Sequence, residues 1–251
     1  MLKNFNLIKT LTLSDFKLRY KGSLLGLLWS FLKPLLMLLI FYVVFSLIIK
    51  LEINNYALFL FLGIILWNFF ADSTTLSMNN LLSKRDLIKK VYFPREVLVI
   101  SSCLNSFLNL LFSLFIFIIS LFLFKIKITI YFLLFIPILI SLFILSLGFS
   151  YLLSGLYVKY RDLDHLWGIL LSIGFWITPI AYSIDFVPKN YLTLYMLNPL
   201  ARIITDSKNI LIYNKIDSIW SILITFLMSI AIYLLGYYIY KKRSLYFAEE
   251  L

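Results

Sequence analysis

The segment from Val97 to Phe124 contains no charged residue, and it limits the possible folds more than any other part of the sequence. A helix needs about 20 mainly apolar residues to cross the hydrocarbon core of a bilayer. Similar runs recur along the chain, so that 62% of its residues are hydrophobic and 14% are charged. A soluble domain has about 45–50% apolar residues and could not cover this much apolar surface. The sequence therefore predicts an integral membrane protein and excludes a soluble enzyme, a disordered chain and a nucleic-acid-binding domain.

We expect an all-α, polytopic protein in which residues 1–251 form a single transmembrane permease domain. Residues 1–26 carry several basic residues and no long apolar run, which predicts an N-terminal interfacial helix on the membrane surface. The second span has to continue through Asp72, and a charge at this depth costs about 2.5–3.5 kcal/mol, so it should face protein or water. The six predicted spans are Leu27–Ile49, Tyr56–Asn80, Val97–Phe124, Ile128–Val158, Leu166–Ser183 and Ser218–Tyr240.

The distribution of basic residues predicts the orientation of these spans. Six spans place both termini on one side of the membrane. Lys and Arg are roughly twice as frequent in the inner segments as in the outer ones if that side is the cytoplasm. We therefore expect cytoplasmic N- and C-termini, and we interpret the net charge of +11 as positive-inside anchoring.

The outer segment between the fifth and sixth spans is long and still apolar. Residues 184–217 contain many Leu, Ile and Tyr residues and are divided by Pro188 and Pro199. A solvated loop would be more polar, whereas irregular backbone within a membrane has to lie against protein or a water cavity. The segment predicts two short re-entrant helices that cover the outer mouth of a passage.

The chain lacks the residue patterns of the common catalytic sites. No two glycines have the spacing of a phosphate-binding loop, so any ATPase would be a separate chain. A single cysteine, Cys103, and a single histidine, His165, exclude disulfide frameworks and metal clusters built from these residues. An ion-driven carrier should have paired intramembrane acids, but only Asp72 is present. A glycolipid enzyme should have more polar groups than Asp162, Asp164 and His165. Transport is therefore the favoured class.

The inner segment Ser83–Glu96, with the sequence SKRDLIKKVYFPRE, predicts a short basic amphipathic helix. Ser83 and Asp86 have the spacing of a helix start, and Pro94 would end the helix. Such a helix could dock into a groove of a cytosolic partner. The alternative is a positive anchor that only fixes the topology. The residues alone leave both interpretations open.

Four segments together resemble the type-2 ABC transporter permeases that export bacterial surface polysaccharides. The first is LTLSDFKLRYKGSLLGLLWSFLKPLLMLLIFYVVFS, before and within the first span, and the second is KKVYFPRE. The third is YVKYRDLDHLWGILL, and the fourth is FWITPIAYSIDFVP followed by LNPLARII. These segments occur in the family's order over nearly the whole chain.

The resemblance implies a homodimeric permease in the cytoplasmic (inner) membrane of a bacterium, with two copies of a cytosolic P-loop ATPase that binds ATP and Mg. This chain would carry no cofactor, metal or catalytic residue. The cargo would be a polyprenyl-linked glycan of the O-antigen (lipopolysaccharide) or capsule type. A teichoic acid exporter is the alternative, and a stand-alone ion-driven carrier is a further one. Residues 83–95 would form the coupling helix, and residues 184–212 would form the outer gate helices.

The candidate site residues form three groups. ATPase coupling is assigned to Lys84, Arg85, Asp86, Leu87, Lys89, Lys90, Tyr92, Arg95, Arg161 and Asp162. Aromatic rings stack on the apolar faces of sugars, and a polymer path is assigned to Trp29, Tyr42, Trp67, Phe70, Trp176 and Tyr182. A lipid pyrophosphate would be received by Lys17, Arg19, Lys21 and Lys33. The alternatives are lipid-facing or interfacial aromatic rings and attraction of the basic residues to anionic membrane lipids.

Overall fold

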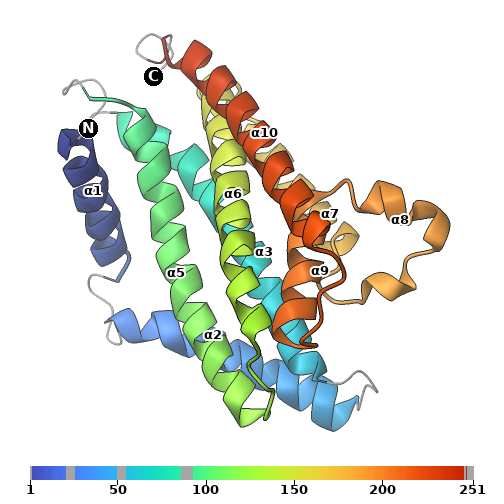
Figure 1. The fold of residues 1–251 in the computed structure, drawn as a ribbon. Helices are drawn as coiled ribbons and strands as arrows, with labels where there is room; N and C mark the ends of the chain where they lie inside the picture. The colour runs from blue at the N-terminus through green and yellow to red at the C-terminus, as the bar shows by residue number, and fades with distance from the viewer. Residues whose placement is uncertain (1, 21–25, 50–54, 86–92, 246, 248–251) are drawn as a thin grey trace.

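The computed structural model describes residues 2–20, 26–49, 55–85, 93–245 and 247, and these residues form a bundle of helices (Figure 1). Within the described residues there is no β-strand, which confirms the all-α prediction. The α-helices are α1 (Leu2–Tyr20), α2 (Trp29–Phe41), α3 (Tyr56–Ser83), α5 (Glu96–Leu123), α6 (Phe135–Tyr157), α7 (Leu163–Ile177), α8 (Lys189–Tyr195), α9 (Pro199–Leu211) and α10 (Ile219–Ser244).

Four helices in the described part of the chain are long and apolar enough to cross a membrane. They are α3, α5, α10 and the continuous helix Ile130–Tyr157, in which a 3₁₀ turn leads into α6. They correspond to the predicted second, third, sixth and fourth spans. The predicted first span contains the shorter apolar helix Trp29–Phe45, and the predicted fifth span overlaps the shorter apolar helix Leu163–Ile177. The chain is thus a multi-pass membrane protein, whereas the total of six spans stays a prediction.

A proline residue explains why α7 is shorter than the expected fifth span. Thr178 precedes Pro179 and is extended, with φ −86° and ψ 142°, as proline favours for the residue before it. The helix α7 therefore ends at Ile177, and the prediction that it continues to Ser183 is wrong. In the first span, Pro34 lies inside α2, and the helix continues as a π-helical segment, Tyr42–Ile48.

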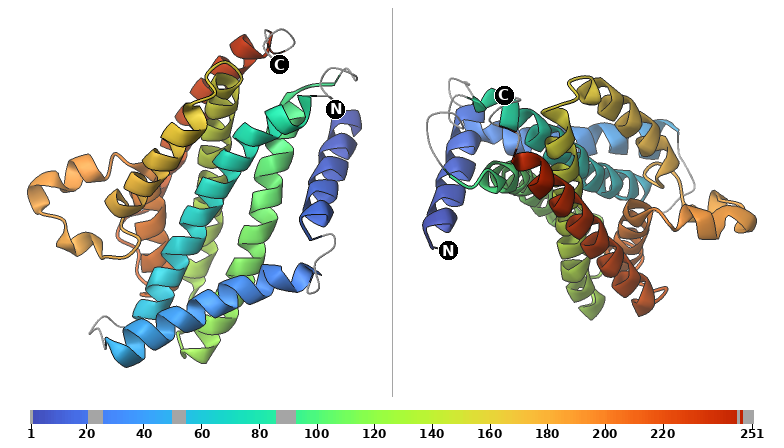
Figure 2. Two further views of the ribbon diagram at one scale, coloured as in Figure 1. Left: turned by 180° about the vertical axis from the view of Figure 1, so that it is seen from behind. Right: turned by 90° about the horizontal axis from the view of Figure 1, so that it is seen from above.

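The closest helix contact is between α6 and α10, and we call it the α6–α10 seam, defined by Gly148, Gly155 and Gly236. A Cβ atom added to Gly148 would lie 2.7 Å from the Cα atom of Tyr233. A Cβ atom added to Gly236 would collide with the carbonyl oxygen of Gly148. Small residues allow two backbones to approach in this way within a membrane. Figure 2 shows the two helices packed along each other in both views.

The helix α3 lies at the centre of the bundle, where α2, α5, α6, α7 and α9 pack around it. Its polar side chains are paired with neighbours. The Trp167 indole donates a hydrogen bond to the Thr74 hydroxyl over 3.0 Å, which joins α7 to α3. The Ser150 hydroxyl donates to the carbonyl oxygen of Ser73 over 3.2 Å, which joins α6 to α3. These two hydrogen bonds satisfy buried polar groups and join α3 to its neighbours.

The N-terminal helices cover one side of this core. The helix α1 runs alongside α5, and the rings of Phe16 and Phe112 stack with centroids 5.9 Å apart (Figure 1). The helix α2 crosses α3 and α5 (Figure 2). The position of α1 relative to a membrane surface stays a prediction.

Candidate functional site

One end of the bundle collects the described residues that are assigned to ATPase coupling. The end of α3, the start of α5, the α6–α7 connection and the end of α10 all lie there (Figure 1), and we call it the C-terminal end. Lys84, Arg85, Arg95, Arg161 and Asp162 belong to these segments. Five further residues of the predicted coupling helix lie outside the described residues, namely Asp86, Leu87, Lys89, Lys90 and Tyr92. The helical form of residues 83–95 stays a prediction.

Polar contacts join the helices at the C-terminal end. The Arg95 guanidinium donates to the carbonyl oxygen of Ser244 and lies over the ring of Phe247, 5.8 Å from its centroid. One residue further along α5, Glu96 accepts a hydrogen bond of 3.2 Å from the Tyr237 hydroxyl. The start of α5 is therefore tied to α10, so a force applied to the segment before α5 would reach α10 directly.

A salt bridge joins α1 to the same end. The Lys84 ammonium lies 2.6 Å and 2.8 Å from the two carboxylate oxygens of Asp15. Both side chains are only partly covered, so the pair contributes about 0.2–1 kcal/mol. In this conformation Lys84 of the predicted docking segment is therefore paired with Asp15 on α1.

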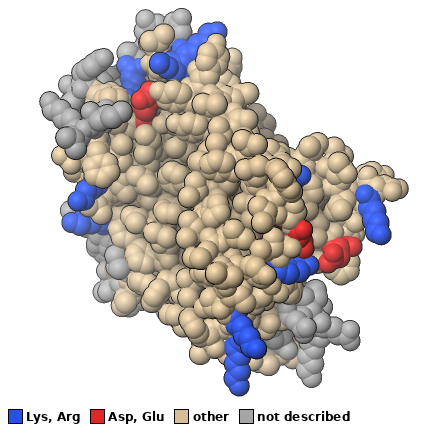
Figure 3. Space-filling model, viewed as in Figure 1, with Lys and Arg blue, Asp and Glu red and all other residues tan. Residues whose placement is uncertain are grey.

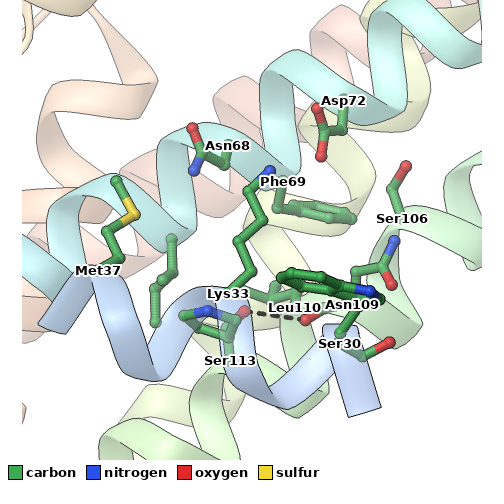
Figure 4. Close-up of a pocket in the computed structure, with 13 residues that line it drawn as sticks. Ser30, Lys33, Met37, Asn68, Phe69, Asp72, Ser106, Asn109, Leu110 and Ser113 are labelled. Carbon is green, nitrogen blue, oxygen red and sulfur yellow. Dashed lines mark hydrogen bonds between the residues drawn. The ribbon is translucent and has the colours of Figure 1, made fainter. Parts of the chain in front are cut away.

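A polar cavity of about 380 Å³ lies between α2, α3 and α5, and we call it the mid-bundle cavity. It is lined by Trp29, Ser30, Lys33, Pro34, Met37, Ile65, Asn68, Phe69, Asp72, Ser106, Asn109, Leu110 and Ser113. Figure 4 shows Lys33 reaching from α2 towards α3, where Asn68 and Asp72 face the same space. Asn68 and Asn109 lie about halfway along α3 and α5, so the polar groups are at the depth where a bilayer tolerates them least.

A second, smaller cavity of about 210 Å³ lies between α1, α3 and α5, and we call it the C-end cavity. It is lined by Asp15, Leu76, Asn79, Asn80, Ser83, Ser102 and Asn105. Ser106 of α5 lines the first cavity and its sequence neighbour Asn105 lines the second. We call them together the α3–α5 groove.

The four residues assigned to a lipid pyrophosphate do not form one described cluster. Lys17 is exposed on α1, and Lys33 lines the mid-bundle cavity on α2. Lys21 and the side chain of Arg19 lie outside the described residues. The pyrophosphate assignment therefore stays a prediction. In the mid-bundle cavity, the positively charged Lys33 has the negatively charged Asp72 as a neighbour.

The six aromatic residues assigned to a polymer path lie in different surroundings. Trp67 and Phe70 are buried in the core, with ring centroids 6.0 Å apart. Trp176 is 70% exposed, whereas Tyr42 packs edge-on against Phe124. The path assignment stays a prediction.

The other two of these six aromatic residues occupy defined places. Trp29 lines the mid-bundle cavity. The Tyr182 hydroxyl donates to the carbonyl oxygen of Ile177 over 3.0 Å and forms a 2.5 Å hydrogen bond with the Tyr195 hydroxyl. Tyr182 therefore joins the end of α7 to α8. These six rings thus form no single lining in this conformation.

The predicted outer segment contains two short helices, each with a proline at its start. Pro188 directly precedes α8, and Pro199 is the first residue of α9. The Asn198 side chain caps α9 by accepting a hydrogen bond of 3.0 Å from the Leu200 backbone amide. Figures 1 and 2 show α8 projecting from the bundle, whereas α9 packs against α3, α6 and α10. A gating role for the pair stays a prediction.

A buried lysine connects α9 to the end of α7. The Lys208 ammonium donates to the carbonyl oxygens of Pro179 and Ile180 over 2.6 Å and 2.9 Å. It also lies 3.3 Å from the centroid of the Phe59 ring. The side chain is 3% exposed, and this burial lowers the pKa of its ammonium. Lys208 therefore connects the irregular turn that follows α7 to α9.

Sequence reasoning missed both Lys208 and the polar face of α5. The α5 residues were visible as a pattern, because Ser102, Ser106, Asn109 and Ser113 recur at intervals of three or four in an otherwise apolar helix. That spacing places them on one helix face. Nothing in the sequence around Lys208 distinguishes a buried, hydrogen-bonded lysine from a solvated one.

The surface has the charge distribution of a membrane protein. Figure 3 shows Lys and Arg near the two ends of the bundle, at the left edge and around the projecting α8 region, with a broad uncharged area in the middle of this face. Among the described residues, no group of three or more His, Cys, Asp or Glu could hold a metal ion. An apolar bundle with polar space halfway along its helices is the form that membrane transport proteins take. The fold therefore defines the class as a multi-pass membrane transport protein.

The comparisons identify the family within this class. Residues 6–207 match the ABC-2 type transporter family, and the chain belongs to it. It is 33% identical over 248 residues to the O-antigen export system permease protein RfbA of Klebsiella pneumoniae, covering 98% of this chain and 95% of the relative. A protein of the same name from Myxococcus xanthus is 27% identical over 247 residues. The chain is therefore the permease subunit of an ABC exporter, and the ATPase subunit with which it works is a separate chain.

Proposed function

We propose that this permease exports lipid-linked O-polysaccharide from the cytoplasm across the inner membrane of a bacterium. The observation that carries the proposal is the match to relatives named O-antigen export permeases over 98% of this chain and 95% of their length. A match of this extent leaves no large segment of either protein unaccounted for. The function is therefore proposed for the whole chain.

The working unit in this proposal is a homodimer of the permease with two copies of a P-loop ATPase. ATP and Mg²⁺ bind to the ATPase subunits, and this chain supplies the membrane passage. The ATPase docks at the C-terminal end, where Arg95 ties the start of α5 to α10. Both termini are then cytoplasmic, and α8 and α9 lie towards the outer side as gate helices. The basic residues Lys17, Arg19 and Lys21 receive the lipid pyrophosphate.

Capsular polysaccharide and teichoic acid are the alternative cargoes. Both are hydroxyl-rich polymers that are built on a lipid carrier inside the cell. The O-polysaccharide is preferred because the relatives from two organisms carry the O-antigen name. The cargo is therefore best tested by following each polymer in the native host.

The cargo test is a deletion of this chain in its host, followed by separate measurement of O-polysaccharide, capsule and teichoic acid at the surface and in membrane extracts. We expect surface O-polysaccharide to disappear and its lipid-linked form to accumulate inside. Expression of the wild-type chain should reverse both effects. Unchanged surface O-polysaccharide, or loss of another polymer in its place, would contradict the cargo assignment.

The coupling test is co-purification with the ATPase subunit. Arg161→Glu, in the exposed α6–α7 connection, should lower the amount of ATPase recovered with the tagged permease. Lys189→Glu is the matched control, because Lys189 is an exposed basic residue on α8, away from the C-terminal end. Equal ATPase recovery from the two variants would contradict docking at this end.

A further inference from the structure

The α3–α5 groove has an unusual number of polar side chains for the flank of an apolar bundle. Asn68 and Asp72 on α3 face Ser106 and Asn109 on α5 across the mid-bundle cavity (Figure 4). Asn80 and Asn105 continue the two rows in the C-end cavity. The groove thus extends the polar surface of the C-terminal end to the middle of the two spanning helices.

Two side chains in the groove are buried without a complete set of partners. Asn105 is 4% exposed and Ser106 is 1% exposed. The Asn105 Oδ1 and Ser106 Oγ atoms have no hydrogen-bond partner among the described residues. Asn105 lines the C-end cavity and Ser106 lines the mid-bundle cavity. Buried polar atoms are normally paired. These two oxygens are inaccessible in this conformation, so they show that the polar face of α5 is incompletely satisfied, and the accessible polar groups of the mid-bundle cavity provide the contacts to a ligand.

The charges in the mid-bundle cavity favour an uncharged ligand. Lys33 is the cavity's basic residue and Asp72 is its acidic residue, so the two balance each other. A phosphate bound by Lys33 would also meet the Asp72 carboxylate, and like charges at this depth repel strongly. The remaining polar groups are amides and hydroxyls, which can both donate and accept hydrogen bonds. They match the hydroxyl groups of a sugar better than a phosphate.

The size and walls of the cavity also suit a sugar. Its volume of about 380 Å³ lies in the range of small-molecule sites, which is about 300–1,000 Å³. Trp29 and Phe69 provide flat apolar surfaces beside the amides. A pyranose ring has an apolar face and a rim of hydroxyl groups, so it needs this combination of surfaces.

We propose that the α3–α5 groove binds a neutral sugar ring of a glycolipid headgroup. Lys33, Asn68, Asp72 and Asn109 bind its hydroxyl groups, and Trp29 covers its apolar face. The helix α1 covers the C-end cavity and is held there by the Asp15–Lys84 salt bridge. The inference rests on the proposed function for its substrate class and adds a recognition site on the flank of each chain.

The test measures protection of a cysteine in the groove by two amphiphiles with the same tail. The full-length Ser113→Cys chain is reconstituted with its ATPase subunit in phosphatidylethanolamine–phosphatidylglycerol nanodiscs, because Ser113 lines the mid-bundle cavity but is not one of the proposed binding residues. A small methanethiosulfonate reagent labels the new thiol, while the wild-type chain gives the background, because Cys103 is buried. The probes are dodecyl maltoside and dodecyl phosphate. Asn190→Cys, at an exposed asparagine on α8, is the matched control.

We expect dodecyl maltoside to slow labelling of Ser113→Cys about tenfold at ten times its half-saturating concentration, by mass action. Dodecyl phosphate should leave the rate unchanged, and neither amphiphile should affect Asn190→Cys. Equal protection by the two amphiphiles, protection by the phosphate alone, or no protection would each overturn the proposal.

The result is separable from the cargo assignment. A different exported polymer would leave protection by dodecyl maltoside intact, because that probe contains no O-polysaccharide. Conversely, absence of protection would show that the groove is not a sugar site. The cargo assignment, which rests on the deletion phenotype, would still stand.

Discussion

The α6–α10 seam and the α3–α5 groove belong to the same bundle but differ in how their helices pack. In the seam, glycines let two helix backbones touch, and an added Cβ atom at Gly148 would lie 2.7 Å from the Cα atom of Tyr233. In the groove, two long helices leave cavities lined by amides, hydroxyls and a pair of opposite charges. This permease therefore combines a closely packed scaffold with a polar region in which some hydrogen-bonding groups have no partner among the described residues.

The largest expected effect is a substitution in the seam. Gly236→Leu should prevent the approach of α6 and α10, because even a Cβ atom would collide with the Gly148 carbonyl oxygen. Overpacking typically costs about 1–3 kcal/mol, and a backbone collision lies at or above the upper end. Thermal unfolding in detergent, followed by size-exclusion chromatography, measures the loss. Gly168→Leu is the control, since no atom lies near a Cβ at Gly168 on α7. Equal stability of both variants would contradict the seam.

The next largest effect compares two buried hydroxyls, one paired and one unpaired. Thr74→Val leaves the Trp167 indole N–H without its acceptor, which should lower stability by about 1–3 kcal/mol. Ser106→Ala removes an oxygen that has no partner among the described residues, so stability should be unchanged or higher. Unfolding of both variants under the same conditions checks the difference. A larger loss for Ser106→Ala would show that this oxygen is paired.

A smaller effect concerns pH and Asp206 on α9, outside the four long helices. Burial raises the pKa of the Asp206 carboxyl to about 6, although the hydrogen bond from Ser221 opposes the shift. The folded state therefore holds a proton more tightly than the unfolded state. Its stabilising contribution is present below about pH 4 and is lost as the pH rises through about 6.

The variant Asp206→Asn should lack this part of the pH dependence. Wild-type stability relative to the variant should fall by on the order of 1 kcal/mol between pH 4 and pH 7. Thermal unfolding of the two proteins across that interval measures the difference, and their shared titrating groups cancel. Parallel pH profiles would contradict a raised pKa at Asp206.

The smallest effect is at the edge of the groove, where Asp15 pairs with Lys84. A double-mutant cycle with Asp15→Ala and Lys84→Ala should give a coupling energy of about 0.2–1 kcal/mol, because the pair is partly exposed. Salt should weaken this coupling further. A coupling energy of zero at low salt would contradict the statement that the Asp15–Lys84 pair holds α1 against the groove.

The sequence predicted the features that depend on local chemistry. Uncharged runs predicted the long helices, and Pro188 and Pro199 predicted the division of the outer segment into α8 and α9. The rule that proline disfavours helix in the preceding residue also explains why α7 ends before Pro179, although the predicted span passed through it. These features could be inferred because a few neighbouring residues determine each of them.

Features that depend on pairing between distant segments could not be predicted. Gly148 and Gly236 lie in different apolar helices, and their sequence spacing does not show that they meet. Trp67 is buried while Trp176 is exposed, yet both occur in similar apolar surroundings in the sequence. Lys208 is buried only because the turn after α7 presents two carbonyl oxygens to it.

The most direct test of the central claim uses inside-out membrane vesicles that contain the permease and its ATPase subunit. Lipid-linked O-polysaccharide is supplied on the outer face of the vesicles, which corresponds to the cytoplasm. With ATP and Mg²⁺, the polymer should become protected inside the vesicles from an added glycosidase, and ADP should not support this protection. Polymer that stays accessible with ATP, in vesicles that hydrolyse ATP, would contradict export by this permease.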